Sequence, residues 1–191
     1  MTTMNVLPNI KRMTIQQAAR RLEKATDKGD SVMLWGSPGI GKTDIMYQLG
    51  ARKKRKVIVF MLNIREPVDM RGIPVTDPLT KTTLWYYPSE LPNVERDGEF
   101  GYLFLDEINA SSPAMMAVAM QLVLEGKIGD YVLPKGWVVV AAGNLISDKA
   151  FAQRMPTALR NRFAHFHIVP DYAAWRVWAV ANNVAPELIA F

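Results

Sequence analysis

One glycine-rich segment combines residue types that can bind a phosphorylated ligand. Its eight residues follow the spacing G-x-x-x-x-G-K-[ST]. Glycines let the backbone bring its N–H groups close to phosphate, Lys42 supplies a positive charge for the β and γ phosphates, and the Thr43 hydroxyl can ligate Mg²⁺. A helix after the segment would point its N-terminus at the same anion. We therefore predict a site for ATP and Mg²⁺ at Gly36, Ser37, Pro38, Gly39, Ile40, Gly41, Lys42 and Thr43.

Two acidic residues follow an apolar stretch farther along the chain. Asp106 and Glu107 come directly after Leu103–Leu105, which is typical of a buried strand. Asp106 is expected to hold the metal ion, and Glu107 to polarise a water for attack on the γ phosphate. Two acids after a strand are a weak signal alone, and the glycine-rich segment upstream favours the functional interpretation.

An amide side chain, Asn144, ends the next apolar stretch. A neutral amide at this position could orient the attacking water or touch the γ phosphate. Gly143 and Asn144 would also suit an ordinary turn. The position at the end of a predicted strand favours the functional interpretation.

Two arginines, Arg160 and Arg162, lie close together near the C-terminal part of the chain. An arginine can stabilise charge on a transferring phosphoryl group, including from a neighbouring subunit. The alternative is an ordinary surface salt bridge. We expect one of the pair to act on phosphate, with Arg162, directly before Phe163, as the first candidate.

These residues need a scaffold, and the apolar pattern predicts one. Continuous apolar strands alternating with helices favour a parallel sheet covered on both faces. Ligands of such sheets bind beyond the carboxyl ends of the strands, which is where the glycine-rich segment, the acids and the amide are expected. The predicted strands are 31–35, 57–62, 102–105, 137–142 and 165–169. Helices are predicted from the N-cap Thr14 to Thr26, over 42–51, 113–124 and 156–161, and from Asp171 onward. A hairpin with Gly129-Asp130 at its turn is predicted for 127–133, and the proline-containing stretch 63–93 is predicted to hold loops and a short hairpin around 83–87.

Composition narrows the class of protein. The chain has 191 residues, enough for one domain with a sizeable core, and its 49% hydrophobic content excludes a disordered chain. The absence of cysteine excludes disulfides and thiolate metal sites and fits a reducing compartment. No apolar run approaches the roughly 18 residues of a membrane span, and the N-terminus lacks the apolar core of a signal peptide. We therefore expect a cytoplasmic protein without membrane contact.

The charge balance leaves nucleic acid open as a partner. The net charge of +5 permits contact with a polyanion but does not require it. The densest basic run, 52–56, is interpreted as a solvated turn, because basic residues are favoured at a helix C-terminus, and contact with DNA or RNA is the alternative. His165 and His167 are interpreted as surface or strand-end histidines in preference to a metal pair.

Together these motifs resemble the AAA+ ATPases, and within them the MoxR-like group. The glycine-rich segment corresponds to Walker A, Leu-Asp-Glu-Ile-Asn at 105–109 to Walker B, Ala-Ala-Gly-Asn at 141–144 to sensor 1, and Ala-Leu-Arg-Asn-Arg-Phe at 158–163 to the arginine-finger segment. The stretch 67–74 is similar to the segment after the second strand of MoxR-like proteins, and the 127–133 hairpin to the one that precedes sensor 1. The likeness spans roughly residues 14–170.

The resemblance implies a fold, an activity and partners. The fold is the α/β three-layer sandwich of P-loop NTPases, here with a five-stranded parallel sheet and the hairpin before sensor 1. Residues 1–170 would form the ATPase core, and 171–191 the start of a helical lid. Such proteins usually form hexameric rings with ATP between subunits, and many remodel protein partners beside a von Willebrand factor A domain protein. Two features depart from the pattern: Ala110 stands where an arginine is frequent, and the lid's sensor 2 arginine is missing.

The leading hypothesis is therefore a MoxR-like ATPase that remodels a protein partner. One rival is an AAA+ ATPase directed at DNA or RNA, such as a helicase loader or a restriction-type translocase. The other is a nucleotide-dependent switch without turnover.

Overall fold

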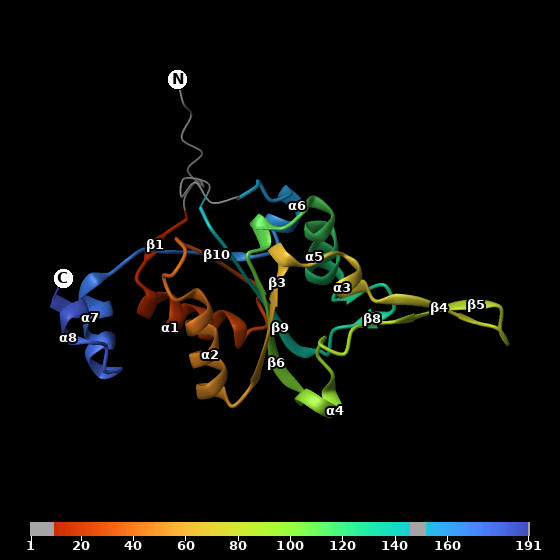
Figure 1. Cartoon of the computed structure of the whole chain (residues 1–191), viewed down its shortest axis with the longest axis horizontal. Coiled ribbons are helices and arrows are strands. Elements are labelled where there is room, and N and C mark those ends of the chain that lie inside the picture. The colour runs from red at the N-terminus through yellow and green to blue at the C-terminus, as the bar shows by residue number, and fades with distance from the viewer. Residues whose placement is uncertain (1–9, 146–151, 191) are drawn as a thin grey trace, which may run out of the picture.

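Six parallel strands form one central sheet in the computed structural model, which describes residues 10–145 and 152–190 (Figure 1). The strand order is β1-β10-β2-β9-β6-β3. The central strand β2 is buried along its whole length, and β9 is buried after its first residue. This explains why these strands read as continuous apolar runs. The strands are β1 (Arg12–Met13), β2 (Val32–Trp35), β3 (Lys56–Met61), β6 (Phe100–Asp106), β9 (Gly136–Gly143) and β10 (Ala164–Ile168).

The expectation of five strands was wrong by one edge strand. β1 pairs Arg12 with His167 and Met13 with Ile168 in parallel. Two residues are too few to give a periodic pattern, so the sequence could not distinguish this strand from the start of the following helix. The other five strands lie where they were predicted, and their ends differ from the predicted ones by no more than two residues.

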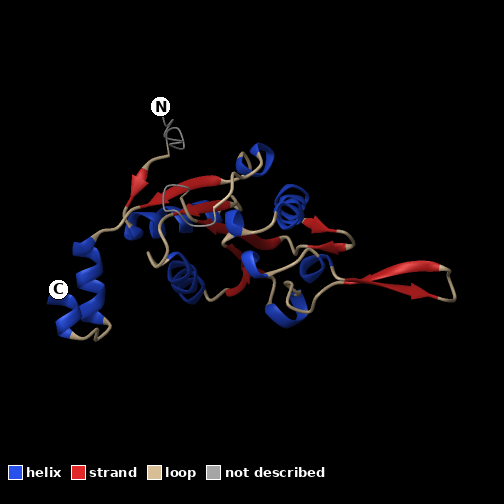
Figure 2. Ribbon diagram, turned by 45° about the horizontal axis from the view of Figure 1, so that its top comes forward, coloured by secondary structure: helices blue, strands red, loops and turns tan. Residues whose placement is uncertain are grey.

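Helices cover both faces of the sheet and produce the predicted three layers (Figure 2). Leu22 of α1 and Met46 of α2 belong to one buried cluster with Phe104 of β6. Met115 of α5 belongs to the other cluster with Leu103, because successive residues of a strand point to opposite faces. The longer helices are α1 (Ile15–Thr26), α2 (Lys42–Lys53), α5 (Pro113–Glu125) and α7 (Tyr172–Ala181); the shorter ones are η1 (Leu62–Ile64), α3 (Val68–Arg71), α4 (Val94–Asp97), η2 (Ile108–Ala110), α6 (Thr157–Arg160) and α8 (Pro186–Ala190).

The N-termini of three helices are fixed by local sequence. Thr14 and Gln17 form a reciprocal capping box at the start of α1. Ser112 accepts a hydrogen bond from the Met115 backbone before Pro113 begins α5, and Asp171 caps α7 in the same way. These caps explain why the three helix starts could be predicted from the sequence to within one residue of their observed positions.

Two antiparallel hairpins interrupt the alternation of strands and helices. β7 (Lys127–Ile128) and β8 (Tyr131–Val132) form the predicted hairpin, with Gly129 at a φ of 56° in its turn. β4 (Ile73–Asp77) and β5 (Thr82–Tyr86) form a longer hairpin that projects from the body (Figure 1). Only a short hairpin around 83–87 was expected there. Pro74 obscured the first strand, and a two-stranded ribbon can accept it because both strands are edges.

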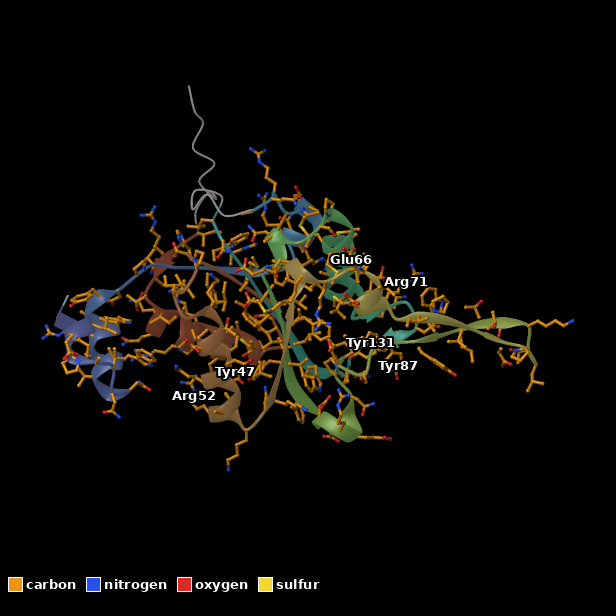
Figure 3. The ribbon with its side chains drawn as sticks, viewed as in Figure 1. Tyr47, Arg52, Glu66, Arg71, Tyr87 and Tyr131 are labelled. Atoms are coloured by element: carbon orange, nitrogen blue, oxygen red, sulfur yellow. The ribbon has the colours of Figure 1, made fainter. Side chains whose placement is uncertain are left out.

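The hairpin of β4 and β5 joins the body next to a pair of aromatic side chains. Tyr87, which follows β5, lies with its ring centroid 5.1 Å from that of Tyr131 in β8 (Figure 3). The Tyr131 hydroxyl donates a hydrogen bond to the Pro92 carbonyl at 2.8 Å.

At the end of the molecule opposite to this hairpin lie α7 and α8 (Figure 1). Within the described residues, no helix has the length and apolar character needed to cross a membrane.

Candidate nucleotide-binding site

The glycine-rich segment forms the loop between β2 and α2, at the carboxyl edge of the sheet. Gly39 and Gly41 have φ values of 76° and 92°, a region that favours glycine. Gly41 is also the N-cap residue of α2, and no side chain caps this helix. The N–H groups of its first turn therefore face the loop, and together with the helix dipole they favour an anion there.

Lys42 lies under the loop, with a relative exposure of only 6%. Its Nζ atom donates hydrogen bonds to the carbonyl oxygens of Gly36 and Ser37, at 2.8 and 3.1 Å, and to the Asn144 side-chain oxygen at 2.9 Å. These three acceptors are uncharged oxygens. The ammonium group is thus held in position beside the loop, where it can exchange an uncharged acceptor for a phosphate oxygen.

Thr43 and Asp106 form the part of the site that suits a magnesium ion. The Thr43 hydroxyl donates to one Asp106 carboxylate oxygen at 2.9 Å, and the Glu107 backbone N–H donates to the other at 2.8 Å. Mg²⁺ prefers oxygen ligands and is usually held by one or two carboxylates together with substrate phosphates. A hydroxyl and a carboxylate oxygen beside the phosphate loop fit that requirement. No cluster of three or more His, Asp or Glu side chains in the described ranges could hold a metal ion on its own.

Glu107 has a strained backbone conformation next to the metal site. Its φ and ψ are 54° and 35°, a left-handed conformation that costs a residue with a side chain roughly 1–2 kcal/mol. The turn ends β6 and places the Glu107 carboxylate 2.7 Å from the Asn144 side-chain nitrogen, which donates to it. Strain of this kind is typical of functional positions.

Asn144 joins the charged groups of the site. Its side-chain oxygen accepts from Lys42 and its nitrogen donates to Glu107, and the residue is 4% exposed. The structure therefore brings the glycine-rich loop, the acidic pair and the amide into one connected site, at the ends of β2, β6 and β9.

The two arginines lie apart from this network. In the part of the chain that the structure describes, no hydrogen bond or ion pair joins the side chain of Arg160 or Arg162 to Lys42, Asn144 or Glu107. Both precede the first residue of β10, whereas the phosphate loop follows the last residue of its parallel neighbour β2. The arginines thus belong to the opposite end of an adjacent strand.

A cavity of about 720 Å³ adjoins the loop between α1, α2 and α7. Its walls include Ile15 and Ala19 of α1 and the aromatic side chains of Tyr172, Trp175 and Trp178 on α7. The sequence analysis did not assign these residues to the site. Trp175 and Trp178 are three residues apart on a helix and therefore share a face. The sequence could not show that this face lines a cavity beside the glycine-rich loop, because that depends on where α7 packs in the fold.

His165 links the strand before the loop to the arginine segment. The Trp35 ring N–H donates to His165 Nδ1 at 2.8 Å, and Nε2 lies 2.7 Å from the Arg160 carbonyl oxygen. A neutral ring with its hydrogen on Nε2 satisfies both partners, since a carbonyl oxygen can only accept. Burial lowers the pKa of His165 below its ordinary value; the hydrogen bond to the Arg160 carbonyl opposes this shift, and the positive charge of Arg160 adds to it. These contacts favour a structural histidine over a metal ligand.

Comparison with known proteins supports the architecture. No family model and no curated protein match the chain. Among solved structures it is similar to a candidate ATPase from Cytophaga hutchinsonii, with a TM-score of 0.59 and 20% identity over 89% of this chain and 51% of that one. It is also similar to NtrX from Brucella abortus, with a TM-score of 0.55 and 13% identity over 88% of this chain and 39% of that one. The chain has the fold of the P-loop NTPases. It spans about half the length of the first of these proteins and less of the second.

The neutral state of His165 makes the stability of this P-loop fold depend on pH. Because the folded-state pKa lies below the unfolded value near 6.5, the unfolded chain binds a proton that the folded chain does not. Stability should therefore fall as the pH drops through about 6.5 toward the folded pKa. Urea unfolding from pH 7.5 to 5.5 should show a smaller loss for His165→Gln than for the parent protein. Parallel profiles would show that His165 does not contribute to the pH dependence.

Proposed function

We propose that this chain is an ATP-hydrolysing AAA+ module that acts with bound magnesium, and that it belongs with the MoxR-like group. One observation supports this above the others: Asn144 joins the buried Lys42 ammonium to the Glu107 carboxylate at the end of three parallel strands. A phosphate cradle alone would suit simple binding. A carboxylate held beside that cradle by an uncharged donor suits activation of a water.

Each residue has a defined task in this proposal. The N–H groups of the loop and of the first turn of α2 bind the triphosphate, and Lys42 donates to its β and γ oxygens. Thr43 and Asp106 hold magnesium, which when bound would neutralise charge on the phosphates. Glu107 accepts a proton from the attacking water. Asn144 keeps the Glu107 carboxylate aimed at that water.

The cavity beside the loop is the proposed site of the base and sugar. It is open to the glycine-rich loop on one side and lined by Trp175 and Trp178 on the other. Aromatic side chains stack on a base with roughly 1–3 kcal/mol per base. The apolar side chains of Ile15 and Ala19 on α1 form the facing wall.

We further propose that hydrolysis needs a neighbouring copy of the chain. Arg160 and Arg162 come just before β10, at the end of that strand that lies away from the loop. They are therefore better placed to contact ATP bound to another subunit than ATP bound to their own. This supports a ring, a hexamer by the resemblance to AAA+ proteins. Remodelling of a protein partner, a von Willebrand factor A domain protein beside it and a cytoplasmic location rest on that resemblance alone.

Three of the five side chains in the basic run 52–56 form ion pairs with acidic residues. Arg52 pairs with Glu23 at 3.1 Å, Lys53 pairs with Glu23 and Asp27, and Lys56 pairs with Asp97 at 2.7 Å. These ion pairs reduce the positive charge that the run presents to a phosphate backbone. The protein-directed function is therefore preferred to the nucleic-acid-directed one.

Replacing the proposed base should separate binding from hydrolysis. Glu107→Gln keeps the size of the side chain but cannot accept a proton, so we expect phosphate release to fall about 100-fold or more while ATP stays bound. Lys42→Ala should lose ATP binding, because it removes the charge that contacts the β and γ phosphates. Phosphate-release kinetics and binding of a fluorescent ATP analogue measure the two effects. The matched control is Glu95→Gln, an exposed carboxylate on α4, which should behave as the parent protein does.

Equal hydrolysis by Glu107→Gln and the parent protein would show that the assigned base is wrong. Binding of ATP without phosphate release by the parent protein, at every protein concentration, would instead identify a nucleotide-dependent switch.

A site shared between copies predicts complementation in a mixture. Glu107→Gln retains both arginines, and the Arg160→Ala/Arg162→Ala variant retains Glu107, so mixed assemblies contain some complete sites. The mixture should hydrolyse ATP faster than the mean of the two variants assayed separately. Mixing each variant with the parent protein tests whether copies exchange. If they exchange and the mixture gives only the mean rate, the arginines do not act between subunits.

A further inference from the structure

The side-chain amide of Asn109 forms hydrogen bonds with both the N–H and the carbonyl group of the Asn144 backbone. Its Nδ2 atom donates to the Asn144 carbonyl oxygen at 2.8 Å, and its Oδ1 atom accepts from the Asn144 N–H at 3.1 Å. Asn109 lies in η2, two residues after Glu107, and is 1% exposed. We propose that Asn109 is a positioning residue for hydrolysis, which sets the orientation of Asn144 and through it that of Lys42 and Glu107. This inference rests on the proposed function.

The amide of Asn109 continues the sheet where the backbone stops doing so. The ladder between β6 and β9 ends at the pair Leu105 and Ala141. Beyond it the chain turns away at Glu107, so no backbone group of β6 lies beside Asn144. A side-chain amide offers one donor and one acceptor. Asn109 therefore gives Asn144 the two hydrogen bonds that a neighbouring strand would give.

The close approach of Asn109 depends on glycine at position 143. A Cβ atom on Gly143 would lie 2.4 Å from Asn109 Oδ1 and 2.8 Å from the Met33 methyl group. The first of these contacts involves the atom that accepts from Asn144. A side chain at this position would thus push the amide out of its pairing geometry, although the strand itself could continue.

Asn109 also contacts the segment that leads to the arginines. Its backbone carbonyl accepts a hydrogen bond from the Gln153 N–H at 2.6 Å, and α6 with Arg160 follows a few residues later. One residue of the segment after the acidic pair therefore contacts both the end of β9 and the approach to the arginine segment.

A change at Asn109 should affect turnover more than binding. The Asn144 side chain can reach Lys42 and Glu107 together only while its backbone is held. Lys42 keeps two further acceptors in the loop, the carbonyls of Gly36 and Ser37, whereas Asn144 is the side chain that donates to Glu107. Loosening Asn144 should therefore misplace Glu107 first, and misplacement of a catalytic group by about 1 Å can cost 100-fold in rate.

The test compares Asn109→Asp with a matched neighbour. Aspartate keeps the size and the acceptor that faces the Asn144 N–H, but in its ionised form it cannot donate to the Asn144 carbonyl. We expect kcat to fall about 10- to 100-fold, with the Kd for ATP changed less than about threefold. The control is Ser111→Ala, which removes another buried hydrogen bond, to the Ile108 carbonyl, without touching Asn144. Ser111→Ala should retain the kcat of the parent protein while losing about as much thermal stability as Asn109→Asp does.

Two further measurements distinguish positioning from mere support of the fold. Hydrogen exchange at the Asn144 amide, measured without nucleotide, should be faster in Asn109→Ala and unchanged in Ser111→Ala. In an Asn144→Ala background, Asn109→Asp should lower kcat by less than about twofold, because residues that act through one another are not additive.

The inference is overturned if Asn109→Asp lowers kcat no more than Ser111→Ala, if the two substitutions at 109 and 144 are fully additive, or if Asn144 exchange does not change. Lack of phosphate release by the parent protein refutes the proposed function, and with it the role in turnover. In that case the exchange experiment still decides whether Asn109 positions Asn144.

Discussion

The Lys42 ammonium imposes the strictest physical demand in this protein. A charge that is almost fully buried is costly unless hydrogen bonds replace the water it loses. The loop supplies two carbonyl oxygens for this purpose, and the end of β9 supplies the Asn144 side chain. The loop must therefore fold back over its own lysine, and β9 must lie beside β2. The same arrangement leaves the ammonium beside the helix N-terminus, where an anion is favoured.

The order of the strands in the sheet determines the geometry of the site. β9 lies between β2 and β6, so the residue that ends it can reach both the loop after β2 and the acids after β6. Asn144 uses its two amide atoms for these two directions. An ionised carboxylate could not donate to the anion, and a hydroxyl carries its donor and its acceptors on one atom, whereas an amide places a donor group and an acceptor on two separate atoms. This explains the chemistry found at that position.

The sequence predicted most of the sheet because the strands are buried on both faces and therefore continuously apolar. It predicted the phosphate loop because glycine, lysine and threonine are needed at fixed spacing. It did not predict β1, which has two residues, or the length of the β4–β5 hairpin. The contacts of Asn109 and the cavity beside α7 were also missed, because both depend on segments distant in sequence. For Asn144, only its place at the end of a strand could be predicted from the sequence. Its hydrogen-bond partners could not, because they depend on the order of the strands in the sheet.

The central claim is that the Gly36–Thr43 loop, with Asp106, binds the triphosphate of ATP and magnesium. A crystal structure with Mg²⁺ and a non-hydrolysable ATP analogue tests it most directly. The account predicts that the phosphates lie in the loop, that Lys42 Nζ moves from an uncharged acceptor to the β and γ oxygens, and that the metal lies between Thr43 and Asp106. A structure in which the analogue binds elsewhere, or in which Lys42 keeps all three acceptors while the nucleotide is bound, would contradict it.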